Sequence, residues 1–446
     1  MPTRRRQTRT VRPGPIDDNE SCWLAELPPY EASPPLTSDL TVDVAIIGGG
    51  LTGISTAWHL AERWPSRRIV LLEAKTLANG ASGRNGGQVL NGINGVEPRD
   101  AETARRIYDA TGSGIDIVER LASHSSLDVG FARRGCLEIS TTAECAEAAH
   151  RRVERYNAWG VPLRWLPGTA TCLHGAHGAV LDPSAGRANT AALVRGLRGP
   201  LVERGVEIYE NSAVSRIEEG ATVTLTVASR AVRARAIVLA TNAYTPALGY
   251  FRAGILPLHS HVVATEPLPA DVWRSLGWPE HDGFTDDRDR IGYGARTAGG
   301  RLLFGGGANA AYTYRFGGST EIGSPPAGAF ATVERRLGDY VPGLATTHPI
   351  AHRWSGPLAI TFDRVCSIGV RGRHDNVYYA LGYSGHGIAL AALAGRVLSD
   401  LYAGDHDAWR DLPFYQRRLP PMPPEPLRWL GYHVYTRLTG RSPRRR

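Results

Sequence analysis

Three glycines and one acidic residue have the types and spacing of a dinucleotide-binding site. Gly48, Gly50 and Gly53 form a GxGxxG sequence, and Glu73 follows twenty residues after the last glycine. The first glycine permits a tight turn, the second lets the backbone approach a pyrophosphate, and the third lets a helix pack closely on a strand. Glu73 can accept hydrogen bonds from ribose hydroxyls, and its charge disfavours a 2′-phosphate. The pattern therefore predicts a dinucleotide other than NADP.

Two further glycine-rich stretches suit a long cofactor. One runs from Gly80 to Gln88 (GASGRNGGQ) and carries a single guanidinium, Arg84. The other, from Gly382 to Gly387 (GYSGHG), precedes an expected helix whose N-terminus can stabilise the negative charge of a reduced flavin. Each stretch alone is also typical of a surface loop or an ordinary helix start. Together they favour FAD over NAD.

Three histidines are candidates for proton transfer. His259 and His261 alternate with Leu258 and Ser260 on an expected strand. If their face meets the substrate, either imidazole can accept the proton of an amine near neutral pH. The alternative is a half-exposed structural histidine on the strand. His386, within GYSGHG, is the third candidate, and its alternative role is to orient the backbone of its loop.

The sequence does not predict a metal site. The five cysteines are scattered and form no CxxC pair, and His174 and His177 have no carboxylate cluster beside them. Unpaired, scattered cysteines fit a reducing compartment, and we expect a cytoplasmic protein. Lys75 is the single lysine, so Schiff-base chemistry at any other position is excluded.

The elements that must position these residues form three separated α/β blocks. Strands are expected at 42–47, 69–73, 206–209, 221–228, 236–240 and 377–381, with more between 250 and 307; helices are expected at 51–63, 101–122, 143–159, 187–204 (with a possible break at Pro200) and 387–402. This order predicts an α/β fold in which a Rossmann-like FAD-binding domain is interleaved with an α+β substrate domain built on an antiparallel sheet. We assign residues 38–95, 182–248 and 354–404 to the FAD-binding domain and 96–181 and 249–353 to the substrate domain, with an extended lead-in at 1–37 and a C-terminal segment at 405–446.

Charge excludes one class of partner. The net charge is +8, but ten arginines in the two terminal segments account for it, so the body of the chain is near neutral. Without a basic stripe on the body, nucleic-acid binding is not expected.

No apolar run approaches the length of a membrane span. The aromatic residues between Leu427 and Leu438 are expected to dock on the body, and membrane contact is not expected.

With these stretches in place, the chain resembles the D-amino-acid-oxidase-like family of FAD-dependent oxidoreductases, and within it the gamma-glutamylputrescine oxidases. The resemblance is carried by GGGLTG at Gly48, GASGRNGGQ at Gly80, LATNAY at Leu239, RLLFGGG at Arg301, and the stretch from Arg353 through GYSGHG. It implies that the substrate sheet covers the flavin and that an amine is oxidised to an imine by hydride transfer. The predicted FAD contacts are Gly48, Gly50, Leu51, Thr52, Gly53, Glu73, Ala74, Ser82, Arg84, Asn85, Gly86, Gly87, Gln88, Val214, Thr241, Asn242, Gly356, Gly382, Tyr383, Ser384, Gly385, His386 and Gly387.

Departures from the family pattern refine this expectation. Ser355–Leu358, where relatives with covalent flavin have a cysteine, contains none, and Cys366 lies too late, so FAD is expected to be non-covalent. Sarcosine-oxidase-like members of the family use lysines near the flavin, and these have no counterpart at Ala389 or in the strand that begins at Arg301. Because one of those lysines takes part in oxygen activation, fast reaction with O₂ is not expected by resemblance. The electron acceptor is O₂ or another oxidant, and a dehydrogenase that passes electrons elsewhere is a credible alternative to an oxidase.

Three reactions remain open at this point. The leading hypothesis is oxidation of a small-molecule amine, either a polyamine derivative or a secondary amine. The second is oxidation of an amino acid (glycine or a D-amino acid), which needs an arginine for the carboxylate; Arg84, Arg296 and Arg353 are the candidates. The third is a non-catalytic electron-transfer flavoprotein subunit, which a partner protein rather than an amine would reduce.

Overall fold

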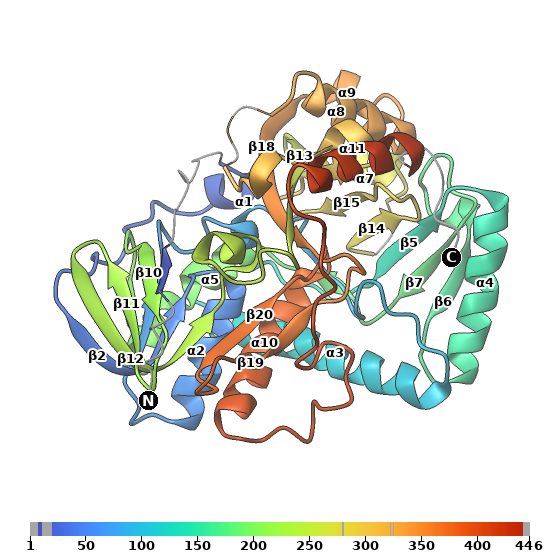
Figure 1. The fold of residues 1–446 in the computed structure, drawn as a ribbon. Coiled ribbons are helices and arrows are strands. Elements are labelled where there is room, and N and C mark those ends of the chain that lie inside the picture. The colour runs from blue at the N-terminus through green and yellow to red at the C-terminus, as the bar shows by residue number, and fades with distance from the viewer. Residues whose placement is uncertain (1–7, 11–19, 279–280, 322, 324, 440–446) are drawn as a thin grey trace.

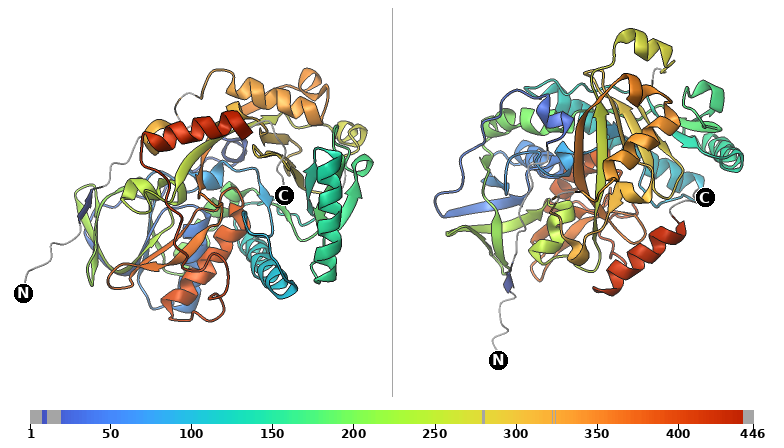
Figure 2. Two further views of the ribbon diagram at one scale, coloured as in Figure 1. Left: turned by 45° about the vertical axis from the view of Figure 1, so that its right-hand side comes forward. Right: turned by 90° about the horizontal axis from the view of Figure 1, so that it is seen from above.

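The computed structural model describes residues 8–10, 20–278, 281–321, 323 and 325–439. Two nine-stranded sheets stand side by side, and helices pack against each of them (Figure 1). The hairpin of β10 and β11 lies at one end of the molecule and α4 at the other, as Figure 2 shows from two further directions.

The first sheet has the strand order β1-β10-β11-β12-β2-β3-β9, with β20 also beside β12 and β19 beside β20. Its strands are β1 (Thr8–Thr10), β2 (Leu40–Ile47), β3 (Ile69–Leu72), β9 (Glu207–Tyr209), β10 (Val214–Glu218), β11 (Val223–Val227), β12 (Arg230–Leu239), β19 (Ser367–Arg371) and β20 (Val377–Leu381). The pairs β12–β2, β2–β3, β3–β9 and β12–β20 are parallel. Helices cover parallel strands on both faces, which is why these strands are almost continuously apolar.

Helices from distant parts of the chain cover this sheet. They are α2 (Leu51–Arg63), α3 (Ala101–Ser123), α5 (Thr190–Gly196), α6 (Arg198–Glu203) and α10 (Gly387–Tyr402). Close packing joins α2 and α10, because Gly395 has no side chain where a Cβ would lie 2.3 Å from Ser55 Oγ. Ser55 Oγ in turn donates a hydrogen bond to Ala392 O at 2.6 Å. The dinucleotide helix is thus held by the last helix of its domain.

The second sheet has the order β17-β13-β16-β15-β14-β5-β7-β6, with β18 beside β13. Its strands are β5 (Cys136–Ser140), β6 (Arg164–Pro167), β7 (Gly178–Asp182), β13 (Leu256–Thr265), β14 (Gly283–Asp286), β15 (Gly292–Arg296), β16 (Leu302–Gly306), β17 (Tyr312–Thr313) and β18 (Ile350–Ile360). All neighbours are antiparallel except β14 and β5. Its helices are α4 (Ala143–Ala158), α7 (Ala270–Ser275), α8 (Ala329–Tyr340) and α9 (Leu344–Thr347). The predicted fold class, an α/β domain interleaved with an antiparallel-sheet domain, is confirmed.

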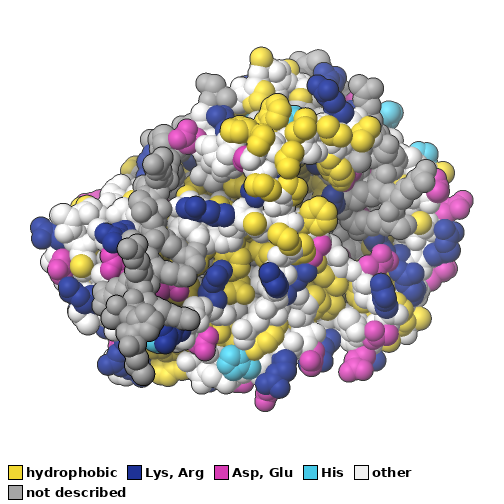
Figure 3. All heavy atoms as spheres, in the orientation of Figure 1, with side chains coloured by type: hydrophobic (Ala, Val, Ile, Leu, Met, Phe, Trp, Pro, Cys, Tyr) yellow, Lys and Arg dark blue, Asp and Glu magenta, His cyan; other side chains and the backbone are white. Residues whose placement is uncertain are grey.

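Short elements complete the fold. They are α1 (Cys22–Ala25), the two-stranded ribbon of β4 (Gln88–Val89) and β8 (Gly186–Arg187), α11 (Leu427–Thr439), and 3₁₀ helices at Ala81–Gly83, Gly168–Ala170, Asn242–Leu248, Asn309–Ala311 and Phe316–Gly318. Apolar side chains gather on the face that carries α11 (Figure 3), where Leu430, Val434 and Leu438 are exposed. Of the helices that the structure describes, none is long and apolar enough to cross a membrane.

Three sequence-based expectations are corrected. The proposed boundary at residue 354 falls inside β18, which pairs with β13 along its whole length and so belongs to the second sheet. The helix expected over 187–204 is two helices that meet at Leu197, while Pro200 stands in the first turn of α6, where a missing N–H costs little. The lead-in is not simply extended, since it contains β1 and α1; residues 1–7 and 11–19 of this segment lie outside the described residues.

Candidate active site

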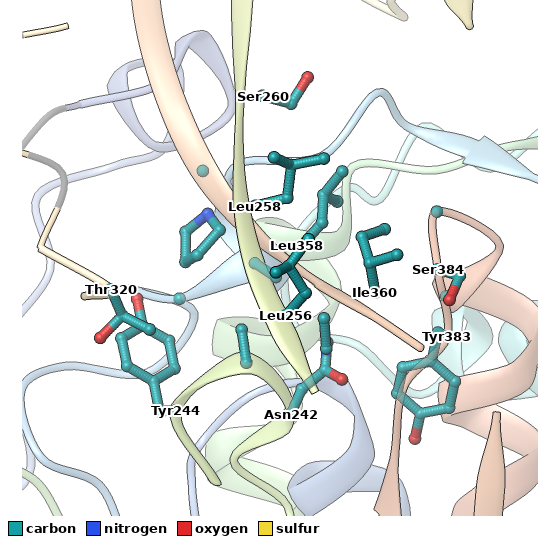
Figure 4. Close-up of a pocket in the computed structure, with 18 of the residues that line it drawn as sticks. Asn242, Tyr244, Leu256, Leu258, Ser260, Thr320, Leu358, Ile360, Tyr383 and Ser384 are labelled. Carbon is teal, nitrogen blue, oxygen red and sulfur yellow. The ribbon is translucent and has the colours of Figure 1, made fainter. Parts of the chain in front are cut away.

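A cavity of about 760 Å³ is lined by residues of both sheets. Figure 4 shows Leu256, Leu258 and Ser260 of β13 beside Leu358 and Ile360 of β18 in one wall. The glycine-rich stretches and the N-termini of α2 and α10 form much of the remaining lining. All but three of the predicted FAD contacts line this cavity: the exceptions are Gly53, Gly87 and Gly382.

Those three glycines lie behind the cavity wall. A Cβ on Gly53 would stand 2.0 Å from Gly48 O, so its absence allows α2 to pack on the turn after β2. Gly87 has a φ of +72°, and a Cβ there would stand 2.7 Å from the indole of Trp23. Gly382 donates its N–H to Asn242 Oδ1 at 3.0 Å. They shape the backbone that carries the lining residues.

Two helices start at the cavity, and in α2 the Leu51 N–H already donates to Ser82 Oγ at 2.8 Å. Gly50 is the N-cap of α2 and His386 the N-cap of α10; neither makes a side-chain cap hydrogen bond, and neither helix has an acidic residue in its first turn. Helix N-termini carry unpaired N–H groups and partial positive charge, so both ends are suited to an anion. Thr52 Oγ1 and Tyr383 OH, 2.9 Å apart, link the two helix starts.

Glu73 stands at the end of β3, next to the turn that leads into α2. Its carboxylate accepts hydrogen bonds from Gly49 N at 2.6 Å and from Lys75 N at 2.9 Å. Burial raises the pKa of the Glu73 carboxyl, and these backbone donors oppose that effect. The acidic residue is therefore positioned by backbone on both sides while it still lines the cavity.

The GASGRNGGQ stretch lies against β18. Arg84 Nε donates to Asn79 O at 2.8 Å and Arg84 Nη1 to Ser355 O at 3.2 Å, while Trp354 Nε1 donates to Arg84 O at 2.9 Å. Gly356 is required at this contact, because a Cβ there would stand 2.8 Å from Arg84 Cβ. The guanidinium is a fixed positive charge at the cavity wall.

The far end of the same stretch connects the two domains. Gln88 Nε2 donates to Phe284 O and to Gly294 O, both at 2.9 Å. Asn85 Nδ2 donates to Thr190 Oγ1 at 2.6 Å on the other side. The stretch is therefore bound to α5 of one domain and to β14 and β15 of the other.

His259 and His261 do not reach the cavity. On β13 the lining residues are Leu256, Leu258 and Ser260, so the alternating histidines point to the opposite face, where His261 lies beside the ring of Phe330 in α8 and His259 Nε2 is hydrogen-bonded to Ser319 O at 3.0 Å. His261 is bonded at both nitrogens, to Ser355 Oγ at 2.6 Å and to Thr313 Oγ1 at 2.9 Å. Burial, His259 and Arg315 lower the pKa of His261 to about 4. The expectation that these histidines face the substrate is corrected, and His386 is the predicted histidine that lines the cavity.

Sequence reasoning missed several polar residues of the cavity wall. Ser260 Oγ and Tyr293 OH lie 2.9 Å apart, and both residues line the cavity. Asp289, Arg290 and Arg364 line it as well. These side chains come from loops and strands far apart in the sequence, so no local motif announces them. Their positions in the sequence therefore do not indicate that they line one cavity.

Two of the three predicted carboxylate-binding arginines lie elsewhere. Arg296 stacks on the Trp273 ring at 4.5 Å, and Arg353 is exposed and donates to Glu334 at 2.8 Å. Neither lines the cavity, whereas Arg84 does. Among the described residues there is no group of three or more His, Cys, Asp or Glu side chains that could hold a metal ion.

Comparisons with known proteins agree with this geometry. The family model of the DAO, or FAD dependent oxidoreductase, family matches residues 43–401. A gamma-glutamylputrescine oxidoreductase of Escherichia coli strain K12 is 32% identical over 90% of this chain and 93% of its own length. The sarcosine oxidase subunit beta of an Arthrobacter species is 26% identical over 84% of this chain and 90% of its own. The crystal structure of glycine oxidase from Geobacillus kaustophilus shares the fold with a TM-score of 0.72 and 23% identity, covering 85% of this chain and 99% of that one.

Proposed function

This chain belongs to the DAO family of FAD-dependent oxidoreductases, and from that premise we propose that it oxidises the C–N bond of a small amine to an imine with FAD held non-covalently in the cavity. One observation carries the proposal: the N-termini of α2 and α10 and the carboxylate of Glu73 line the same cavity as an apolar wall of the substrate sheet. The N-terminus of α2 suits the phosphates of the cofactor, the N-terminus of α10 suits the reduced ring, and Glu73 suits the ribose.

The residues present fit FAD. The cavity of about 760 Å³ lies within the usual range of cofactor sites, roughly 300–1,000 Å³. We propose that the N-terminus of α2 binds the pyrophosphate, that Glu73 binds the ribose and that the GYSGHG stretch meets the ring. Non-covalent binding is supported because none of the described cysteines lines the cavity, and burial raises the pKa of the Cys366 thiol to about 12. A protonated thiol is a poor nucleophile.

Bound FAD would supply the hydride acceptor. The side chains of Leu256, Leu258, Leu358 and Ile360 would exclude water from the reacting carbon and orient the substrate. An apolar wall also lowers the pKa of a bound ammonium group, because burial disfavours the charged form. The amine can therefore lose its proton without a strong base in the site.

Hydroxyl groups rather than the strand histidines would contact the amine nitrogen. Burial raises the pKa of Tyr293 to about 12, so its phenol stays protonated at neutral pH and shares a hydrogen bond with Ser260 Oγ. A neutral hydroxyl pair can donate to the amine lone pair or accept its N–H. His386 remains the predicted histidine with access to the cavity, either as a proton carrier or as the residue that orients its loop.

The names of relatives support an amine as substrate. The Escherichia coli relative is named for gamma-glutamylputrescine and the Arthrobacter relative for sarcosine, and both compounds have C–N bonds next to a methylene or methyl group. We favour a polyamine derivative or a secondary amine, with glycine or a D-amino acid as the alternative, because the relative at 32% identity is named for a polyamine derivative and the glycine oxidase is 23% identical. Of the three arginines considered for an amino-acid carboxylate, Arg84 lines the cavity, whereas Arg296 and Arg353 do not.

An absorbance spectrum of the purified protein followed by anaerobic titration tests this function. We expect flavin bands, release of the flavin into the supernatant after acid precipitation, and bleaching by secondary amines or polyamine derivatives in preference to glycine or D-alanine. Slow recolouring in air would favour a dehydrogenase. Flavin that only a partner protein reduces would support the electron-transfer alternative.

A matched pair of variants separates cofactor binding from general damage. Gly53→Val should abolish flavin binding, because the side chain would collide with Gly48 O. Gly199→Val in α6 has open space around it and should keep the flavin. A folded Gly53→Val protein with full flavin content would contradict the proposed binding mode, and circular dichroism checks that both variants are folded.

A further inference from the structure

Helix α11 carries an apolar stripe that faces away from the body of the protein. The stripe consists of four aliphatic side chains, each between 49% and 76% exposed: Leu427, Leu430, Val434 and Leu438. Their spacing of three, four and four residues places them on one side of the helix, within an arc of about 80°. The helix lies at the outer edge of the molecule in both views of Figure 2. A continuous exposed row of this kind marks a surface that binds a partner.

The opposite side of α11 is held on the body by polar and aromatic contacts. The Arg290 guanidinium carbon lies 5.5 Å from the ring centre of Tyr432 and 5.4 Å from that of Tyr435. Asn309 Nδ2 donates a hydrogen bond to Thr436 O at 2.6 Å. These contacts fix the rotation of the helix about its axis. The two tyrosines therefore dock on the body, while the aliphatic residues are directed outward.

The charge of this part of the chain has a single sign. Residues 427–446 contain six arginines and no aspartate or glutamate. Within α11, Arg437 is exposed and Arg428 is half-buried; the other four, which lie outside the described residues, are Arg441, Arg444, Arg445 and Arg446. An outward apolar stripe beside arginines is typical of a helix that lies in the plane of a membrane surface. Anionic lipid headgroups attract such a basic segment.

The helix that carries the stripe is also a wall of the cavity. Leu427 and Tyr435 line the cavity and are 60% and 43% exposed. An α-helix is about 10 Å across with its side chains. A surface bound to the stripe would therefore lie within one helix diameter of the cavity.

Charge disfavours a second copy of this chain as the occupant of the stripe. A two-fold dimer through α11 would set the same patch of two chains against each other. The arginines of residues 427–446 would then face those of the partner, and this segment offers no acidic side chain to pair with them. Like charges opposed in this way weaken association.

We infer that α11 binds an anionic lipid surface. The aliphatic stripe enters the region between headgroup and acyl chain, and the arginines contact the anionic headgroups. The contact is peripheral, since no helix among the described residues is able to cross a membrane. It differs from the expectation drawn from the sequence, because the direction of the stripe depends on how α11 packs. The inference does not rest on the proposed function, since lipid binding needs no amine.

Sedimentation with vesicles tests the inference on the full-length, flavin-loaded protein. We expect binding to vesicles of phosphatidylglycerol and phosphatidylcholine in equal parts, and roughly 10-fold or more weaker binding to phosphatidylcholine alone. Raising the salt from about 0.1 M to about 1 M, where charges are screened beyond roughly 3 Å, should release much of the protein. Absence of binding to both kinds of vesicle would overturn the inference.

A matched pair of valines tests whether the stripe makes the contact. Val434 is 49% exposed in α11, and Val202 is 54% exposed in α6 on the other sheet; neither lines the cavity. Val434→Glu should weaken vesicle binding roughly 10-fold or more, because it places a negative charge at the lipid surface, whereas Val202→Glu should leave it unchanged. Circular dichroism and flavin content check that both variants are folded. Equal binding by the two variants would contradict the assignment of the stripe.

A second pair tests the arginines. One variant replaces four arginines after α11 with glutamine, and its control replaces four near the start of the chain; the positions are Arg441, Arg444, Arg445 and Arg446 against Arg4, Arg5, Arg6 and Arg9. The first should lose roughly fivefold in affinity for each arginine removed, and the second should lose much less. Equal losses would reveal a general attraction of a basic protein and overturn the inference.

Analytical ultracentrifugation without lipid covers the alternative of a second copy. We expect the unchanged protein and Val434→Glu to have the same mass in solution. A lower mass of Val434→Glu alone would assign the stripe to contact between two copies of this chain and overturn the lipid inference.

Discussion

The imidazole of His261 lies between two hydroxyl groups, Ser355 Oγ and Thr313 Oγ1, in a buried layer below α8. The fold lowers its pKa from 6.5 to about 4, so it is neutral at physiological pH. Between these two values the unfolded chain binds a proton here and the folded chain does not. Neutral His261 therefore makes its whole contribution to the free energy of unfolding above pH 6.5, and this contribution is lost as the pH falls toward 4.

We predict that His261→Gln makes the protein less sensitive to mild acid. Glutamine can bond to the same hydroxyls but does not titrate. The loss of unfolding free energy between pH 7 and pH 5, measured by urea denaturation, should be smaller in the variant by about 2 kcal/mol. Flavin reduction by amine should continue, because His261 faces away from the cavity. Loss of flavin reduction in a stably folded variant would restore the strand histidine as a catalytic candidate.

Gln88 provides a second prediction at this scale. Its Nε2 supplies two buried backbone carbonyls, Phe284 O and Gly294 O. Gln88→Leu would remove both hydrogen bonds, which should cost on the order of 1–3 kcal/mol of unfolding free energy. Gln416→Leu, at an exposed position, should change stability by less than about 0.5 kcal/mol. Equal effects of the two substitutions in chemical denaturation would contradict this account.

Single residues differ in how far their roles can be predicted from sequence. Gly53 and Glu73 were predictable, because a local turn fixes both the spacing and the chemistry. His261 was not, because a shift of one residue on a strand exchanges the two faces, and only tertiary packing decides which face meets the cavity. Arg290 was not either, since its surroundings come from β14–β15, β18–β19 and α11 together.

At the scale of elements, the two helices of the cofactor site, α2 and α10, pack closely against each other at Gly395 and Ser55. A Cβ on Gly395 would stand 2.3 Å from Ser55 Oγ and 2.4 Å from the Ser55 carbonyl carbon. Because one of these atoms belongs to the backbone, a rotamer change cannot relieve the clash. The two helix N-termini hold their relative position only while this contact remains close.

We predict that Gly395→Val lowers both stability and flavin content. Overpacking of this kind costs typically 1–3 kcal/mol or more, and displacement of α10 would carry GYSGHG away from α2. Gly338→Val in α8 is the control, since nothing lies within 4 Å of a Cβ there. Thermal unfolding and the ratio of flavin to protein absorbance measure the two effects. Unchanged flavin content in Gly395→Val would show that the helix contact does not position the cofactor site.

Elements were predictable where the pattern of apolar residues is local. Helix α10 and strand β20 both span the predicted residues. The helix is apolar around most of its circumference, and the strand is a short apolar run. The sheet to which β18 belongs was not predictable, because an apolar strand has the same sequence pattern in either sheet. Its pairing with β13 depends on tertiary structure.

For the whole molecule, the cavity lies where two sheets and α11 meet, so a cofactor there would connect the two domains. We predict that removal of flavin by acid ammonium sulfate lowers the unfolding temperature and that added FAD restores it. At free FAD 100 times its dissociation constant the gain is about 2.7 kcal/mol. FMN should restore less, because it leaves the adenosine contacts at Glu73 and Val214 unfilled. Equal rescue by FMN would contradict the predicted adenosine site.

The packing of α10 on α2 also has a consequence for synthesis of the protein on the ribosome. Domains usually fold as their residues emerge, the N-terminal one first. Here the dinucleotide turn at Gly48 leaves the ribosome long before Gly387–Tyr402, the helix that packs on α2. Strand β20 is equally late, although it pairs with β12 in the first sheet. Nascent chains would therefore expose an unfinished cofactor domain for most of translation, and the flavin would be captured only near its end.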